Sequence, residues 1–347
     1  MKACVLHGIG DIRYEEVAVP EPAQGEVLLK VRASGICGSD LPRIFSKGTY
    51  HFPTIPGHEF AGEIVAAGDG VADKLIGCRA TIFPLIPCRK CSACQIGEYA
   101  QCQDYNYFGS RCDGGFAEYV AVPVWNLVQV PESLSFEEAA IAEPAAVAIH
   151  ALRQSGIEIG DQVAIFGAGP IGLLMGQWSY AWGARKVLLI DIDPAKIDFA
   201  KKMGFEHVWN SLDGDPERWL ISETGGRGVD LAVEAAGVSA TLEQCLQSTR
   251  QFGRIVALGN PAGEMKISQK AYWELLRKQL KIFGTWNSSY VSLPKSDWIL
   301  AIDAMINHKI RVKPFITHRI GLKQGTAAFA MMQDRSETFN KVMFVID

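Results

Sequence analysis

The 347-residue sequence has little net charge and no excess of basic side chains. Its 38 aspartates and glutamates outnumber its 34 lysines and arginines, giving a formal net charge of -4 and a pI near 6.0. A protein that binds nucleic acid or an acidic membrane surface by releasing counterions needs a broad cationic face. The charge balance therefore argues against nucleic acid and against a membrane as partners.

The sequence also has no long hydrophobic run. The longest, from Val163 to Gly176, is too short to span a bilayer and contains four glycines. The first residues, MKACVLHGIGDIRYEEV, become polar early and show no apolar core of a signal peptide. Repeats, low-complexity tracts and disordered tails are not evident. Without a signal peptide or a membrane span, the protein is expected to be cytoplasmic. Its length and its 48% hydrophobic content predict two domains.

The region from residue 25 to about residue 131 predicts strands. The runs EVLLKVRASG, FAGEIVAAG, CRATIFP and GGFAEYVAVP alternate apolar and polar side chains and are separated by turn residues. This pattern favours an antiparallel barrel or sandwich. The segment 133–154 changes to helical periodicity, with Ser135 as a cap followed by Glu137 and Glu138.

The middle of the chain alternates strands and helices. The run QVAIFGAGPIGLLMGQWSYAWGARKVLLIDID predicts a strand, a glycine turn, a helix and a second strand that ends at Asp191. Further buried strands are predicted in VDLAVEAAG, RIVALG and KIFGTW, separated by the helical stretches SATLEQCLQSTRQF and QKAYWELLRKQL. This order indicates a parallel, doubly wound sheet. The last apolar run, KVMFVI, is expected to rejoin the first domain.

The glycine turn predicts a dinucleotide site. Glycines let the backbone approach a pyrophosphate, and the following helix offers its N–H groups and positive dipole end. The candidate residues are Gly167, Gly169, Pro170, Ile171, Gly172, Asp191 and Lys196. Asp191 lies where an acid that binds the adenosine ribose is expected. Because its carboxylate would repel a 2′-phosphate, it favours NAD over NADP. Lys196 either covers the adenosine end or is a solvated helix lysine.

Nine cysteines are present, and four of them are closely spaced. The four are Cys88, Cys91, Cys94 and Cys102, whereas Cys4, Cys37, Cys78, Cys112 and Cys245 are scattered. The pattern C-x2-C-x2-C-x7-C suits a tetrahedral Zn²⁺ with no open position, which indicates a structural site. An iron–sulfur cluster and unligated thiols are the alternatives.

A second set of possible metal ligands is dispersed along the chain. Cys37 lies in GICGSD, His58 and Glu59 lie in PGHEF, and Glu143 lies in AEPAAV. A thiolate, an imidazole and a carboxylate are the ligand types of a catalytic zinc, which keeps one position open. Each residue also has an ordinary structural explanation, as a buried small residue, a turn histidine or a helix carboxylate.

The motifs GICGSD, PGHEF, the four-cysteine lobe, DGGFAEY, AEP and GAGPIG, in this order, resemble the zinc-dependent medium-chain alcohol and polyol dehydrogenases along the whole chain. The resemblance implies an α/β plus β fold. A GroES-like catalytic domain, residues 1–150 and 286–347, would carry both zinc sites. An NAD-binding Rossmann domain, residues 151–285, would be inserted into it.

The resemblance also implies roles for single residues. Cys37 and His58 match catalytic zinc ligands, and the four clustered cysteines match structural zinc ligands. The simple alcohol dehydrogenases have a second cysteine ligand where this chain has Glu143, a difference typical of the polyol branch. The third ligand is then Glu59, Glu143, or each at different stages. Ser39 matches the hydroxyl that passes the alcohol proton towards solvent, although it can also be an ordinary turn serine.

Within the family, GSDLPRIF and YFGSRCDGGFAEY are most similar to the branch that oxidises galactitol 1-phosphate to tagatose 6-phosphate. These stretches contain Arg43, Lys47 and Arg111, which either pair with a substrate phosphate or are solvated charges. Trp286, Asn287 and Tyr50 are further candidates for the substrate pocket.

Several alternatives remain at this point. A free-polyol dehydrogenase of the sorbitol or xylitol type and a threonine-type dehydrogenase share the same zinc and NAD motifs. A zinc-lobe binding module without catalysis is the alternative of another class, but it leaves GAGPIG unused. The family and the apolar run from Lys281 to Trp286 suggest a homodimer or homotetramer.

Overall fold

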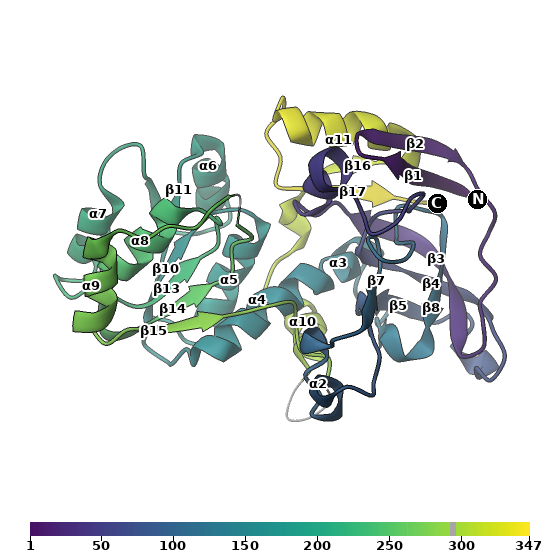
Figure 1. Ribbon diagram of the computed structural model, residues 1–347, viewed down its shortest axis with the longest axis horizontal. Helices are drawn as coiled ribbons and strands as arrows, with labels where there is room; N and C mark the ends of the chain where they lie inside the picture. The colour runs from purple at the N-terminus through teal and green to yellow at the C-terminus, as the bar shows by residue number, and fades with distance from the viewer. Residues whose placement is uncertain (262, 292–295) are drawn as a thin grey trace. The chain divides into compact units, whose positions relative to one another are not determined.

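The computed structural model describes residues 1–261, 263–291 and 296–347. It divides into two compact units. Unit 1 comprises Met1–Ala146, Ser289–His308 and Val312–Asp347, and unit 2 comprises Val147–Ser288 and Lys309–Arg311. Both chain ends lie in unit 1 (Figure 1). The assignment of catalysis to 1–150 with 286–347 and of NAD binding to 151–285 stays a prediction.

Unit 1 is built on a mixed sheet. Within the described residues its strand order is β16 (Ile316–Ile320), β17 (Lys341–Val345), β3 (Glu26–Gly35), β4 (Glu59–Ala67), β5 (Arg79–Ile82) and β9 (Leu127–Gln129), with β8 (Tyr119–Pro123) paired to β3. The four runs predicted as strands form β3, β4, β5 and β8. The C-terminal β17 pairs antiparallel with β3, which confirms that KVMFVI rejoins the first part of the chain (Figure 1).

The core of unit 1 follows from the strand alternation. Along β3, Val27, Leu29 and Val31 are fully buried and alternate with partly exposed neighbours. Phe116 and Phe344 pack edge to face across this core, with ring centroids 5.0 Å apart. Two small hairpins complete the unit, β1 (Lys2–Gly8) with β2 (Asp11–Glu16), and β6 (Leu85–Pro87) with β7 (Tyr105–Tyr107).

The helical segments of unit 1 are mostly short. They are α1 (Asp40–Pro42), η1 (Arg43–Lys47), η2 (Asp73–Leu75), α2 (Ser92–Gln95), η3 (Tyr99–Gln101), η4 (Val124–Asn126), α3 (Phe136–Ala140), α10 (Asp297–Ile306), η5 (Lys313–Phe315), η6 (Leu322–Gln324) and α11 (Gly325–Asp334). The predicted cap Ser135 is confirmed: its hydroxyl accepts from the Glu138 N–H, and the Glu138 carboxylate accepts from the Ser135 N–H, each at 3.2 Å. α4 (Ala142–Ser155) continues into unit 2.

Unit 2 contains the predicted parallel sheet. Its strand order in the described ranges is β12 (His207–Asn210), β11 (Lys186–Asp191), β10 (Gln162–Phe166), β13 (Val229–Glu234), β14 (Thr249–Ala257) and β15 (Lys281–Gly284). All adjacent pairs are parallel. Its helices are α5 (Pro170–Ala181), α6 (Pro194–Lys202), α7 (Pro216–Glu223), α8 (Ser239–Ser248) and α9 (Gln269–Arg277). In chain order the strands run 3-2-1-4-5-6, so the order reverses at β10, as in a Rossmann fold.

Two expectations for unit 2 were wrong. The helix predicted over 239–252 ends at Ser248, because Thr249 begins β14 and pairs with Val229. The strand in KIFGTW was expected to be buried, but β15 is the last strand of its sheet, and Ile282 is 44% exposed. Its other edge is not paired with any described strand.

Within the part of the chain that the structure describes, no helix is both long enough and apolar enough to cross a membrane. A cytoplasmic location stays a prediction.

Candidate active site and metal centres

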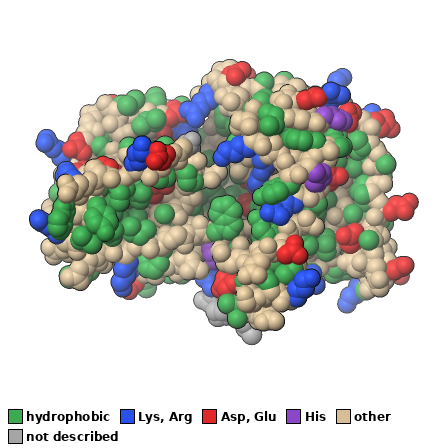
Figure 2. All heavy atoms as spheres, viewed as in Figure 1, with side chains coloured by type: hydrophobic (Ala, Val, Ile, Leu, Met, Phe, Trp, Pro, Cys, Tyr) green, Lys and Arg blue, Asp and Glu red, His purple; other side chains and the backbone are tan. Residues whose placement is uncertain are grey.

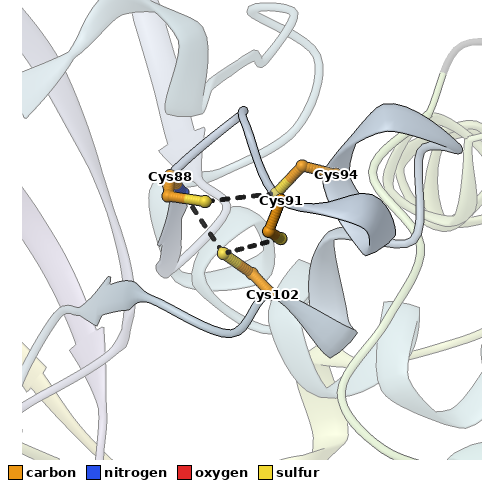
Figure 3. A group of neighbouring side chains, drawn as sticks. All are labelled: Cys88, Cys91, Cys94 and Cys102. Carbon is orange, nitrogen blue, oxygen red and sulfur yellow. Dashed lines mark hydrogen bonds between the residues drawn. The ribbon is translucent and has the colours of Figure 1, made fainter.

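The four clustered cysteines point towards one another in the lobe between β6 and β7 (Figure 3). The Cys88 and Cys94 sulfurs are 4.0 Å apart, and the Cys91 and Cys102 sulfurs are 3.9 Å apart. In a tetrahedron of sulfurs about 2.3 Å from zinc, neighbouring sulfurs lie about 3.8 Å apart. The cluster therefore fits a single tetrahedral ion with no position left for a substrate.

Backbone groups prepare this cluster for a cation. The Cys88 N–H donates to the Cys102 sulfur at 3.2 Å. A backbone hydrogen bond from Gln103 lowers the pKa of Cys91 to about 6. The thiolate is the form that binds metal, so the lowered pKa favours coordination by Cys91, whereas burial raises the pKa of Cys94 to about 12.

Aromatic side chains attach the lobe to the rest of unit 1. The Arg89 guanidinium lies 4.6 Å from the Trp125 ring centroid, and Tyr99 packs edge-on against the same ring at 4.9 Å. Trp125 in turn packs against Tyr290, which stacks on Phe83 with centroids 4.7 Å apart. Besides its cysteine cluster, the lobe is therefore held by these aromatic contacts with the rest of unit 1.

The second cluster lies where β3 ends and β4 begins. Ligand atoms of Cys37, His58 and Glu59 all lie within 4.8 Å of one another. Gly35 is opposite Glu59 in the antiparallel ladder, which brings the residues after β3 beside those at the start of β4. The turn before His58 contains Gly57, which has φ +98° and the Phe116 ring where a Cβ would lie. Only glycine fits that position.

A buried carboxylate lies behind His58. Asp40 is fully buried and accepts hydrogen bonds from the Cys37 N–H at 3.0 Å and from the Arg43 guanidinium at 2.9 Å. His58 Nδ1 lies 3.3 Å from the same carboxylate. Burial opposes ionisation, but His58 and Arg43 hold the pKa of Asp40 below its usual value. A carboxylate at Nδ1 orients the ring and leaves Nε2 for a metal.

Glu59 is paired with a lysine from the other end of the chain. Lys341, at the start of β17, places its Nζ 2.9 and 2.6 Å from the two carboxylate oxygens. Glu59 is 1% exposed and Lys341 3%. Burial opposes the charge of Lys341, but Glu59 raises its pKa. Any cation that binds Glu59 directly must therefore compete with this amine.

Glu143, in the first turn of α4, is the second carboxylate candidate. It is buried, but it lies outside the group of ligand atoms formed by Cys37, His58 and Glu59 in the described residues. Burial, aided by the nearby charge of Glu59 and opposed by His58, raises the pKa of Glu143 to about 7. A carboxylate that is costly to ionise there favours a bound cation.

Ser39 lies beside the candidate ligand Cys37. Its hydroxyl donates to the Cys37 sulfur at 3.2 Å and accepts from the Arg43 guanidinium at 3.2 Å. Ser39 as a whole is half-buried. The role of Ser39 as a proton carrier stays a prediction.

The glycine turn and Asp191 come together in unit 2. Gly167 follows β10 with φ +117°, and Gly169 precedes α5, whose first residue is Pro170. The Asp191 carboxylate, at the end of β11, accepts from the Ala168 N–H at 2.8 Å. Lys196 lies 3.7 Å from that carboxylate. The remaining turn residues, Ile171 and Gly172, form the start of α5.

The three candidate phosphate-binding cations have different surroundings. Arg43 is engaged by Asp40 and Ser39, and Lys47 is exposed and makes no hydrogen bond or ion pair with the described residues. Arg111 lies between two tyrosine rings, one of them Tyr50. The other proposed pocket residues, Trp286 and Asn287, belong to unit 2.

Reasoning from the sequence did not identify three residues that the structure places at the candidate site. Asp40 follows Ser39 within GICGSD, so a search for a carboxylate that supports His58 could have found it. Lys341 is 282 residues from Glu59, and nothing in the sequence relates the two. Tyr107 was also missed, and its ring centroid lies 5.7 Å from that of His58.

Comparison with family models settles the family. Residues 23–132 match the alcohol dehydrogenase GroES-like domain, and residues 170–307 match the zinc-binding dehydrogenase domain. The chain is 36% identical over 320 residues to galactitol 1-phosphate 5-dehydrogenase of Escherichia coli K12, with 92% of each chain covered. The chain belongs to the zinc-binding medium-chain dehydrogenases.

Other members of the family are similar to this chain in sequence and in structure. Sorbitol dehydrogenase of Bacillus subtilis is 38% identical over 268 residues, which covers 76% of each chain. The crystal structure of galactitol-1-phosphate dehydrogenase from Escherichia coli superposes with a TM-score of 0.94 at 34% identity over 100% of both chains. A structure from Sinorhizobium meliloti bound to NADP gives a TM-score of 0.90 at 32% identity, covering 99% of each chain. The expected GroES-like and Rossmann fold is confirmed.

The raised pKa of Glu143 makes a prediction about pH. After the catalytic metal is removed, folded Glu143 keeps its proton up to about pH 7, whereas an unfolded carboxyl loses it near pH 4.5. The metal-free protein therefore loses stability as pH rises through this window, on the order of 3 kcal/mol. Glu143→Gln should lack this loss, as measured by urea unfolding across the window. A stability difference between the two proteins that does not change with pH would contradict the assignment.

Proposed function

We propose that the chain is a zinc-dependent, NAD-linked oxidoreductase that converts a secondary hydroxyl of a polyol or polyol phosphate to a ketone. The best candidate reaction is galactitol 1-phosphate to tagatose 6-phosphate. The observation that carries the proposal is the convergence of Cys37, His58 and Glu59 in unit 1, with the buried Glu143 near enough to feel the charges of His58 and Glu59. The relatives that act on galactitol 1-phosphate and sorbitol support a polyol as substrate.

Cys37 and His58 would hold the catalytic zinc, with Glu143 as the carboxylate ligand. Lys341 occupies both oxygens of Glu59, which favours Glu59 as a buried neighbour of the site over direct ligation. When bound, zinc would supply Lewis acidity, which lowers the pKa of a bound water, and by analogy of a bound alcohol, to about 7. Asp40 fixes the His58 ring for this task.

Ser39 would take the substrate proton. Its hydroxyl touches the Cys37 sulfur, so an alcohol bound beside Cys37 lies within reach of it. Arg43 donates to the Ser39 oxygen at 3.2 Å, which leaves the hydroxyl hydrogen pointing away from the guanidinium. To relay the proton, Ser39 would accept it from the substrate on the remaining lone pair of its oxygen, while its own hydrogen leaves the Cys37 sulfur and passes to solvent water.

The glycine turn of unit 2 would hold the nicotinamide dinucleotide. Backbone N–H groups at the start of α5 would bind the pyrophosphate, and Asp191 would accept hydrogen bonds from the adenosine ribose. The four clustered cysteines would hold a second zinc that orders the lobe and takes no part in the reaction.

The zinc content provides the first test. We expect two zinc atoms per chain, because each cluster fits one ion. Mild chelation should remove one of them together with all NADH production on a polyol panel, because an open site with three protein ligands releases metal more readily than a closed tetrathiolate site. Cys37→Ser should contain a single zinc, show no turnover and keep its thermal stability. A wild-type protein with one tightly held zinc and no turnover would defeat the proposal.

The cofactor preference provides a second test. Asp191→Asn keeps an acceptor for the Ala168 N–H but removes the charge beside the ribose. We expect kcat/KM for NAD to fall about 10-fold and the ratio of NADP to NAD use to rise by at least the same factor. Lys201→Gln, an exposed change on the neighbouring α6, serves as the control. Equal use of NAD and NADP by the wild type would show that Asp191 does not select the cofactor.

Unit 2 also has an apolar surface suited to self-association. Tyr272, Trp273 and Leu276 of α9 and Ile282 of β15 are all exposed, and hydrophobic side chains gather over α9 in Figure 2. An unpaired edge strand beside an apolar helix face is a site where a second copy can add to the sheet. We therefore propose a homo-oligomer that associates through this edge.

Sedimentation velocity tests this association. Ile282→Glu places a charge on the edge strand and should convert the oligomer to the 37.9 kDa chain. Ile159→Glu makes the same change at a side chain that is 87% exposed elsewhere in unit 2, and should leave the oligomer intact. If the wild type already sediments as a single chain, the proposed interface is wrong.

A further inference from the structure

Arg111 is a cation that lacks an acidic partner in the described part of the chain. Its guanidinium carbon lies 4.0 Å from the ring centroid of Tyr50 and 4.4 Å from that of Tyr105. Its Nε is buried and has no hydrogen-bond partner. Aromatic faces attract the charge of a guanidinium but leave its in-plane N–H groups without acceptors. The group is therefore held in place while its hydrogen-bonding capacity is unused.

The other two candidate cations are not both held in place and free to donate hydrogen bonds to a ligand. Arg43 already donates to Asp40 and Ser39, and it helps to hold the carboxylate behind His58. Lys47 is an exposed ammonium with no described contact that would fix its position. A fork-shaped donor with a fixed plane suits the oxygens of a phosphate better than a mobile point charge does.

The position of Arg111 relates it to the catalytic cluster. Tyr105 and Tyr107 are two residues apart on β7, so their side chains lie on the same face of the strand, about 7 Å apart along it. Tyr107 packs against His58, and its carbonyl accepts the backbone N–H of Arg111 at 2.9 Å. The strand β7 thus carries Tyr107 beside the candidate metal ligand His58 and, two residues earlier, Tyr105, whose ring supports Arg111.

Tyr107 itself adds a polar group between these two places. Tyr107 is half-buried, and its ring centroid lies 5.7 Å from that of His58. A phenol hydroxyl can donate to or accept from a substrate hydroxyl. The face of β7 therefore offers a hydroxyl near the candidate metal site and a guanidinium farther away.

We propose that Arg111, held between Tyr50 and Tyr105, binds a terminal phosphomonoester of the substrate while the reacting hydroxyl lies beside Cys37 and His58. The proposal rests on the proposed function and adds to it the residue that selects phosphorylated over free polyols. The distance along β7 favours a substrate whose phosphate is several carbons from the reacting hydroxyl, as in a hexitol phosphate.

The test compares galactitol 1-phosphate with galactitol as substrates of three proteins. Arg111→Met removes the charge and the N–H donors but keeps a long side chain between the tyrosines. Arg111→Lys keeps the charge and loses the planar fork. For Arg111→Met we expect kcat/KM on galactitol 1-phosphate to fall about 10- to 100-fold, and kcat/KM on galactitol to change by less than about threefold. Arg111→Lys should lose an intermediate amount on the phosphorylated substrate alone.

One control variant and the comparison of the two substrates separate this role from others. Lys47→Gln removes a positive charge near Tyr50 in sequence and should keep at least about a third of the phosphate preference, because the preference depends on a positioned donor. Loss of the preference in Lys47→Gln with its retention in Arg111→Met would overturn the proposal. Equal losses on both substrates in Arg111→Met would assign Arg111 a structural role and would also overturn it.

A different measurement distinguishes failure of the proposed function from failure of the proposed role of Arg111. If the wild type oxidises no polyol, calorimetric titration with galactitol 1-phosphate still measures binding at Arg111. Binding about 10-fold weaker to Arg111→Met than to the wild type would sustain the phosphate site without the reaction. Equal binding would reject it. If the wild type oxidises free and phosphorylated polyols equally well, the reaction stands and the inference about Arg111 fails.

Discussion

The antiparallel pairing of β3 with β4 is the constraint on which the candidate active site depends. The ladder sets Gly35 opposite Glu59, and this register places Cys37, just beyond β3, beside His58, just before β4. A slip of one residue would turn alternate side chains to the other face and separate the thiol from the imidazole. The pairing of β17 with β3 adds Lys341 to the same place from the other end of the chain. A single sheet therefore assembles groups from three distant parts of the sequence, and no local motif could do so alone.

The three buried carboxylates near the candidate metal site differ in whether a positive side chain pairs with them. Asp40 has Arg43 and His58 as neighbours, and Glu59 has Lys341, so each of these buried carboxylates has a positive partner. Removing charges from water is costly unless a partner and hydrogen bonds replace the lost solvation. Glu143 makes no ion pair of this kind within the described residues, and burial raises its pKa to about 7. Of the three acids, Glu143 thus gains most from a cation, which is the physical reason to favour it over Glu59 as a ligand.

The parts that could be predicted from the sequence are those in which the chemistry is local. The four cysteines lie on one short lobe, and the glycine turn directly joins a buried strand to a helix, so spacing alone indicated both sites. Cys37 and His58 needed the family resemblance, because only strand pairing brings them together. Lys341 could not be predicted, since its partner is 282 residues away and the run KVMFVI indicates nothing beyond a strand. The error at β15 has a similar origin, because an apolar run does not reveal whether its strand lies at the centre or the edge of a sheet.

The candidate metal ligands and the proposed phosphate-binding residue Arg111 are held in place by different kinds of contact. The groups that would bind metal and move a proton are attached to the paired ends of β3 and β4, where the sheet leaves them little freedom. The guanidinium of Arg111 is attached to the chain just after the short strand β7, and it is aromatic stacking that holds it in place. Tyr50, one of its two supporting rings, is itself 69% exposed. Substitutions at such a position would alter substrate contacts without disturbing the register that creates the candidate metal site. A family can therefore keep one reaction while its members differ in substrate, and the residues that decide the substrate are to be sought outside the motifs that define the family.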